Sequence, residues 1–146
     1  MKKIQNSKGF TLIELLVVIV IIGILASFMM VNYIGVRARA RDTQRKSDLR
    51  QVQTALELYR SDSGSYPAAL PACGASLAFN NVTYVQKIPC DPSSNAQYSY
   101  QTAFGNSAYT LIACLENIND GQKDTANNGA ACTGGATNRS YTLISP

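Results

Sequence analysis

The chain has 146 residues, which is enough for one small folded domain with an anchor and too few for two hydrophobic cores. Its formal net charge of +4 includes Lys2, Lys3 and Lys8, and without these three the thirteen basic side chains fall to ten against nine acidic ones. The net charge of the remaining chain therefore gives no argument for a polyanionic partner. Histidine is absent, and no nucleophile elbow, phosphate-binding loop or useful pair of carboxylates occurs, so the sequence does not predict an enzyme.

An apolar segment dominates the N-terminal region. Glu14 is the only charged residue among the 22 residues from Phe10 to Val31. A helix needs about 20 apolar residues to cross a bilayer. A cleaved secretory signal would be shorter and would be followed by small residues for cleavage, but here Gly23 and Ala26 lie inside the apolar run. The segment therefore predicts a membrane-spanning helix that stays on the mature protein.

A short motif leads into this segment. It runs Lys8-Gly9-Phe10-Thr11-Leu12-Ile13-Glu14 and resembles the prepilin signal of type IV pilins and type II secretion pseudopilins. The resemblance implies cleavage between Gly9 and Phe10 by a membrane aspartyl protease on the cytoplasmic side, followed by N-methylation of Phe10. Residues 1–9 would then be a cleaved leader.

Glu14 is the second feature of this motif with a functional meaning. A carboxylate one turn into a membrane helix is costly, and such residues are functional by default. Cleavage would create an α-amine at Phe10, on the same helix end. The resemblance implies that Glu14 pairs with the amine of a neighbouring subunit and so sets the axial stagger of a fibre. The alternative is that Glu14 simply reaches the membrane interface.

The helical pattern continues beyond the membrane segment. Apolar residues recur there at helical spacing. They form a stripe made of Leu49, Val52, Leu56 and Tyr59. We expect one helix from about residue 10 to about residue 59, ended by a turn cluster at 61–65. Within it, residues 10–31 span the membrane and 32–61 form an amphipathic outer half.

Basic residues cluster just beyond the apolar segment. Four of them share a broad face of the predicted helix, and these are Arg37, Arg41, Arg45 and Lys46. This basic face could contact anionic lipid headgroups before assembly or DNA phosphates. We favour a solvated or intersubunit face balanced by Asp42 and Asp48. No aromatic residues are interleaved with the arginines, which weakens the case for single-stranded DNA.

Residues 62–146 form the predicted globular head. Strand signals, rich in β-branched and aromatic residues, lie at 97–101, 108–115 and 140–144, with a hairpin turn at 104–107. Residues 66–83 predict an irregular connection. Together with the helix, these signals fit the α+β pilin fold that the resemblance implies, in which one long N-terminal helix packs on a small antiparallel sheet of three to four strands.

Four cysteines lie in the head, at Cys73, Cys90, Cys114 and Cys132. Zinc and iron–sulfur ligation are disfavoured, because no close Cys-x-x-Cys pair and no histidine occurs. An even number of cysteines in a small polar domain beyond a membrane anchor indicates disulfides formed in an oxidising compartment. We expect the pairs 73–90 and 114–132, which close short loops, and each bond would stabilise by about 3 kcal/mol. The alternative is four free thiols.

The stretch from Glu116 to Arg139 is rich in Asn, Asp, Gly and Thr and predicts a long loop. Its Asp120-Gly121-Gln122 and Asp124 are similar to the segment in which major pseudopilins hold calcium. The resemblance makes Asp120, Asp124, Asn127 and Asn128 candidate calcium ligands, since calcium takes six to eight oxygens. The alternative is a surface loop held by a disulfide, because the spacing is not that of an EF-hand and no bidentate glutamate is suitably placed.

Three functions fit these features. We favour a structural subunit of a type IV pilus-like fibre for adhesion, motility or surface attachment, because of the expected disulfides and the Ser-, Asn- and Thr-rich head. The alternative is a major pseudopilin that drives protein export by type II secretion, because residues 55–60, 64–67 and 87–92 resemble those of major pseudopilins. A DNA-uptake pilin is the third.

The resemblance also implies partners and a location. The partners are further copies of the chain in a helical homopolymer, minor pilins, a prepilin peptidase, an assembly-platform membrane protein and, before assembly, the lipid bilayer. The expected location is the inner membrane with the head outside the cytoplasm, and afterwards a surface or periplasmic fibre. No cofactor other than the candidate calcium is implied.

Overall fold

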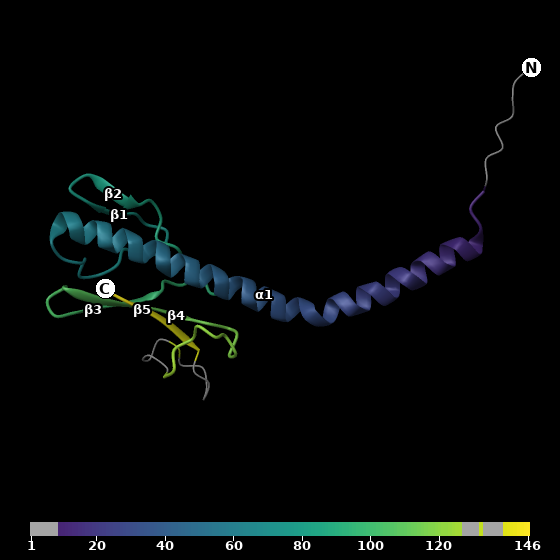
Figure 1. Cartoon of the computed structure of the whole chain (residues 1–146). Helices are drawn as coiled ribbons and strands as arrows, with labels where there is room; N and C mark the ends of the chain where they lie inside the picture. The colour runs from purple at the N-terminus through teal and green to yellow at the C-terminus, as the bar shows by residue number, and fades with distance from the viewer. Residues whose placement is uncertain (1–8, 127–131, 133–138) are drawn as a thin grey trace, which may run out of the picture. The chain divides into compact units, whose positions relative to one another are not determined.

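The computed structural model describes residues 9–126, 132 and 139–146 (Figure 1). The chain divides into two compact units, one up to Val36 and one from Arg37 to Pro146. Helix α1, Leu12–Ser63, contributes to both units, and five strands belong to the second. This order of one long helix followed by short strands confirms the α+β pilin-like fold expected from the sequence.

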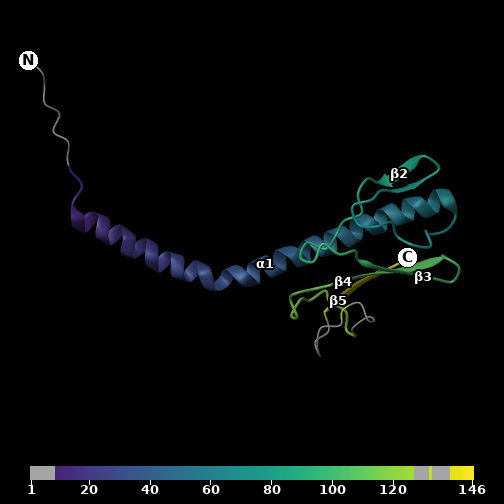
Figure 2. The ribbon, with the colours of Figure 1, turned by 180° about the vertical axis from the view of Figure 1, so that it is seen from behind.

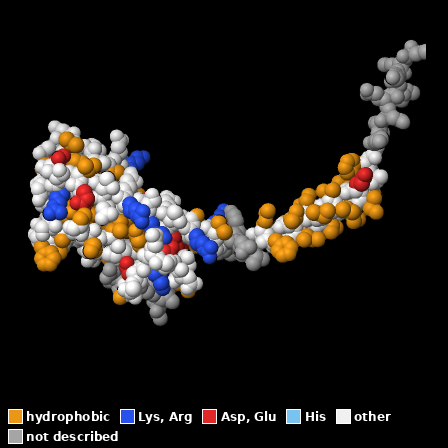
Figure 3. Space-filling view, viewed as in Figure 1, with side chains coloured by type: hydrophobic (Ala, Val, Ile, Leu, Met, Phe, Trp, Pro, Cys, Tyr) orange, Lys and Arg blue, Asp and Glu red, His pale blue; other side chains and the backbone are white. Residues whose placement is uncertain are grey.

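The first unit contains the apolar part of α1. Residues Leu12–Met29 are long and apolar enough to cross a membrane. Their side chains are exposed throughout, and Figure 3 shows apolar side chains along this segment. Nothing in the described part of the chain packs on this apolar surface, which is of the kind that lipid or another protein covers.

The second unit is built around the outer part of α1. Leu49, Val52 and Leu56 of the predicted stripe are fully buried, and Tyr59 packs against their cluster. The helix extends to Ser63, four residues beyond the predicted end. Its last turn is closed by the Gly64 N–H, which donates to the Arg60 carbonyl at 2.8 Å, and Gly64 adopts the left-handed conformation, with φ of 81°, that commonly ends helices.

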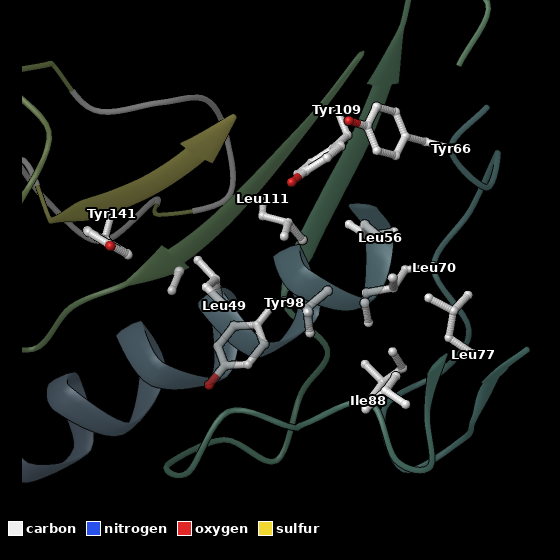
Figure 4. Close-up of a cluster of buried hydrophobic side chains, with 14 of the residues drawn as sticks. Leu49, Leu56, Tyr66, Leu70, Leu77, Ile88, Tyr98, Tyr109, Leu111 and Tyr141 are labelled. Carbon is white, nitrogen blue, oxygen red and sulfur yellow. The ribbon is translucent and has the colours of Figure 1, made fainter. Parts of the chain in front are cut away.

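A three-stranded antiparallel sheet packs on this helix. It contains β3 (Ser99–Ala103), β4 (Ala108–Cys114) and β5 (Ser140–Ile144) in the order β3-β4-β5. Strand β3 begins two residues later than predicted, because Gln97 instead pairs with Cys90 in an isolated bridge. Leu111 in the central strand is fully buried and, with Tyr98 and Tyr109, faces the helix stripe (Figure 4).

A second, two-stranded sheet was not expected from the sequence. Strands β1 (Leu77–Phe79) and β2 (Val82–Val85) pair antiparallel where the sequence predicted an irregular connection. Asn80 and Asn81 form the turn, both with positive φ, as a two-residue hairpin of the mirror-image type requires. The helix lies between this hairpin and the three-stranded sheet (Figures 1 and 2), so the core surrounds the helix on two sides.

Candidate processing and assembly site

The backbone changes from irregular to helical just after the predicted cleavage point. Gly9, Phe10 and Thr11 lie outside the helix, which begins at Leu12. Gly9 and Phe10 are both exposed, and the Phe10 side chain is 81 % accessible. Proteolysis favours exposed, non-helical backbone. The bond between Gly9 and Phe10 therefore lies where a peptidase can reach it without unwinding a helix.

The start of the helix is fixed by a reciprocal pair of hydrogen bonds between Thr11 and Glu14. The Thr11 N–H and hydroxyl donate to the Glu14 carboxylate at 2.8 and 2.7 Å. The Glu14 N–H donates in return to the Thr11 hydroxyl oxygen at 3.3 Å. This is a capping box, in which two side chains satisfy backbone donors that the first helical turn leaves unpaired.

The capping box gives Glu14 a role that the sequence analysis did not assign. The signal was present, because Thr followed three residues later by Glu at the start of an apolar run is the pattern of such a box. An ionised carboxylate has about four acceptor positions. Glu14 can therefore hold the helix start and still accept hydrogen bonds from an α-amine at Phe10, which stays a prediction.

A buried ion network lies in the second unit, centred on Arg45. The Arg45 side chain is only 3 % exposed. Its guanidinium donates to both oxygens of Asp91, with the Nε–Oδ2 distance at 2.6 Å and the Nη2–Oδ1 distance at 3.1 Å. Its Nη1 also lies 2.7 Å from Asp42 Oδ1 and 2.9 Å from Glu116 Oε1. Arg45 therefore joins the helix to two distant segments of the head.

Asp42 and Arg41 extend this network. The Asp42 carboxylate accepts the backbone N–H groups of Glu116 and Asn117, both at 2.8 Å. Arg41 forms a two-pronged pair with the Glu116 carboxylate, through its Nε at 2.7 Å and through its Nη2. With Lys46 pairing with Asp120, three members of the predicted basic face are engaged by carboxylates of their own head. The expected solvated or intersubunit face is wrong at Arg45, which is buried in its own head and paired there with Asp42. Asp48 does not balance the face and instead accepts the hydroxyl of Tyr98.

These contacts lower the pKa values of three acids. Burial opposes ionisation of Asp91, but hydrogen bonds from Arg45 and from the N–H groups of Ser94 and Ser93 outweigh it and hold its pKa well below the usual range. Hydrogen bonds from Arg41 lower the pKa of Glu116. The three carboxylates are thus held as anions at neutral pH, including Asp120, whose pKa is lowered by the Lys46 ammonium.

Comparison with known proteins gives two family matches. Residues 4–30 match the family described as "Prokaryotic N-terminal methylation motif", which includes the whole cleavage and capping region. Residues 32–133 match the family described as "Type II secretion system (T2SS), protein G", which covers most of the chain. This chain belongs to the type II secretion system protein G family. Its family is a structural one, in agreement with the expectation that the chain is not an enzyme.

Individual relatives agree with the family assignment. The type II secretion system core protein G of Escherichia coli is 31 % identical over 140 residues, which cover 88 % of this chain and 94 % of the relative. That of Vibrio cholerae is 33 % identical over 109 residues, 68 % of this chain and 74 % of the relative. The type IV wide pilus major component PilA4 of Thermus thermophilus is 43 % identical over 83 residues, 55 % of this chain and 63 % of the relative. No solved structure matches this chain.

Two disulfides lie beside the ion network in this member of the protein G family. Cys73 bonds to Cys90, and Cys114 bonds to Cys132, with Cα–Cα distances of 5.1 and 5.4 Å. These are the two pairs expected from the sequence, each of which closes a short loop. Cys90 directly precedes Asp91, and Cys114 lies two residues before Glu116, so each disulfide is next in sequence to an acid that binds Arg45.

The candidate calcium ligands fall into two groups. Asn127 and Asn128 lie outside the described residues. Asp120 and Asp124 are described, and both carboxylates have partners within the chain: Lys46 and the Gln122 N–H for Asp120, and β5 for Asp124. Among the described residues, no group of three or more acidic, histidine or cysteine side chains is placed to hold a metal. Calcium binding stays a prediction.

The Arg45→Met variant should strongly destabilise the head, because it leaves three carboxylates facing one another without their shared cation. Removing one partner of a buried ion pair costs about 3–5 kcal/mol. The control is Arg50→Met, which replaces an exposed side chain on the same helix and should change the free energy of unfolding by no more than about 0.5 kcal/mol. Chemical denaturation of the detergent-solubilised chain, followed by circular dichroism, measures both.

The cost of Arg45→Met should also depend on pH. Since the pKa values of Asp91 and Glu116 are lowered by folding, their contribution to stability is complete above the unfolded values near 4 and is lost as the pH falls through the folded values. The difference between wild type and variant should therefore shrink as the pH falls from about 5 towards about 2. An equal difference at both ends of this range would contradict the network.

Proposed function

We propose that this chain is the major pseudopilin of a type II secretion system. It is made as an inner-membrane precursor, cut between Gly9 and Phe10, methylated on Phe10 and assembled through α1 into a fibre that drives protein export. This differs from the adhesion or motility pilus favoured on composition. The observation that carries the proposal is the protein G family match over residues 32–133, which extends through most of the head.

The structure supports the steps of this proposal at the N-terminus. The Gly9–Phe10 bond is exposed ahead of the helix, and the apolar segment that follows can anchor the precursor in the membrane. Cleavage removes three lysines and creates an α-amine next to the capping box. In a low-dielectric fibre interior, an unpaired Glu14 carboxylate would be costly. Pairing with the amine of a neighbouring Phe10 would remove that cost and fix the register between subunits.

A subunit of a type IV pilus is the second candidate. The identity of 43 % to the wide pilus major component of Thermus thermophilus favours it, although the match covers 55 % of this chain. DNA uptake, the third function, relied on the basic face. Arg41, Arg45 and Lys46 pair with carboxylates of the head and so present little net positive charge to DNA phosphates.

Replacing Glu14 by Gln separates its two roles. Gln also completes a capping box, so the helix should still begin at Leu12, but the loss of charge removes the pairing with the Phe10 amine. We expect processing to continue and assembly to fail, as judged by an intact mass beginning at methylated Phe10 and by loss of cross-linked multimers from the membrane. Thr11→Ala is the matched variant, since it removes the box and keeps the charge. Normal multimers built from Glu14→Gln alone would contradict the pairing.

The processing step provides the test of function. A Cβ added at Gly9 meets no atom within 4 Å in the described chain, so Gly9→Ala leaves the fold intact and acts at the peptidase. In cells whose own copy carries Gly9→Ala, we expect uncleaved precursor in the membrane and retention of exported proteins in the periplasm. Gly23→Ala, inside the apolar segment, is the control and should be processed and functional.

The same cells distinguish the two leading functions. Loss of protein export, with no change in the long fibres that can be sheared from the surface, is the outcome for a pseudopilin. Loss of sheared fibres with export unchanged would replace the proposal with the type IV pilus.

A further inference from the structure

The loop between β4 and β5 is attached to helix α1 by a lysine. The Lys46 ammonium lies 2.8 Å from Asp120 Oδ2 and donates to the Gln122 side-chain oxygen at 3.1 Å. The other oxygen of Asp120 accepts the Gln122 N–H at 2.9 Å. The Lys46 and Asp120 side chains are only 15 % and 16 % exposed, so this pair is shielded from water far more than an ordinary surface ion pair.

Asp124, the other described candidate calcium ligand, binds β5. Its Oδ2 accepts the hydroxyl groups of Ser140 and Thr142, both at 2.6 Å, and its Oδ1 accepts the Thr142 N–H at 3.2 Å. The Asp124 N–H donates to the Ser140 carbonyl at 2.8 Å. This aspartate therefore joins the loop to the sheet through neutral donors.

These contacts do not fit a calcium site. Calcium takes six to eight oxygens at 2.3–2.6 Å. Here Asp120 already binds a cation, and a second cation on the same carboxylate would be repelled by the ammonium. The carboxylate of Asp124 is turned to the donors of β5, and the described residues provide no third acidic ligand nearby.

We propose that the ammonium of Lys46 takes the place of a metal ion and fastens this loop to α1, so that the head keeps its fold without calcium. The start of the loop is held in the same way, because Arg41 and Arg45 bind Glu116 and the Asp42 carboxylate accepts two backbone N–H groups there. Cations at positions 41, 45 and 46 thus secure the first part of the loop from one side of the helix. This proposal depends on contacts of the head and not on the export function.

The pKa of Asp120 is shifted in the direction expected when a carboxylate pairs with an ammonium. The hydrogen bond from Lys46 is the main cause that lowers the pKa of Asp120, which keeps the carboxylate ionised for its cation. Lysine provides three donors on a compact charge, and two of its contacts, Asp120 and Gln122, lie in the same short turn.

The test uses the full-length chain in detergent and calcium ions as the probe. Thermal unfolding is measured in EDTA and in excess calcium chloride. The wild type should melt at the same temperature in both. If the head had a calcium site, calcium at a concentration of 100 times the Kd of that site would raise the Tm of a domain of this size by roughly 10 °C. A rise of the wild-type Tm with calcium would overturn the proposal, and this measurement needs no variant.

Variants then identify the cation. Lys46→Met should lower the Tm in EDTA by several degrees and speed amide exchange in residues 116–124, Lys46→Arg should recover most of the loss, and the exposed Arg50→Met should change neither. A calcium response that arises only in Lys46→Met would also support the proposal, because the metal would then occupy the place of the ammonium. Unchanged Tm and unchanged exchange in Lys46→Met would overturn it.

Discussion

The bidentate pairing of Arg45 with Asp91, and its further contacts with Asp42 and Glu116, is the interaction on which the arrangement of the head depends. Burying a guanidinium is costly unless its donors are matched by acceptors in good geometry. Two segments that are far apart in the sequence, around Asp91 and Glu116, must therefore meet at one point on α1. The path of the chain before β3 and after β4 follows from that requirement.

The disulfides and the ion network act on the same segments. Cys90 and Cys114 lie one and two residues from acids that bind Arg45, so each covalent bond limits how far its acid can move. A second unit of about a hundred residues has a modest hydrophobic core, and here the core surrounds one helix. The two disulfides and the ion pairs of Arg45 add stability to segments outside that hydrophobic core. The first unit differs, since its described helix is exposed, apolar and long enough to cross a membrane.

Features whose interacting residues lie close together in the sequence could be predicted, and those whose partners lie far apart in the sequence could not. The motif around Gly9 and Glu14, the helix stripe and the strands of the main sheet are local patterns, and the structure or the family match supports each fold element. The basic face was harder, because Arg41 and Lys46 find their partners about 75 residues away, at Glu116 and Asp120. Composition likewise cannot tell whether an aspartate in a loop will face a metal or a lysine. The β1–β2 hairpin was missed because its strands have three and four residues.

The most direct measurement of this arrangement is amide hydrogen exchange at Glu116 and Asn117 in the full-length chain with EDTA present. Their N–H groups donate to the buried Asp42 carboxylate, which is itself held by Arg45. If the network fastens the loop to the helix, both amides exchange far more slowly than in the unfolded chain, without any metal. Exchange at the unfolded rate, or protection that returns only when calcium is added, would contradict it.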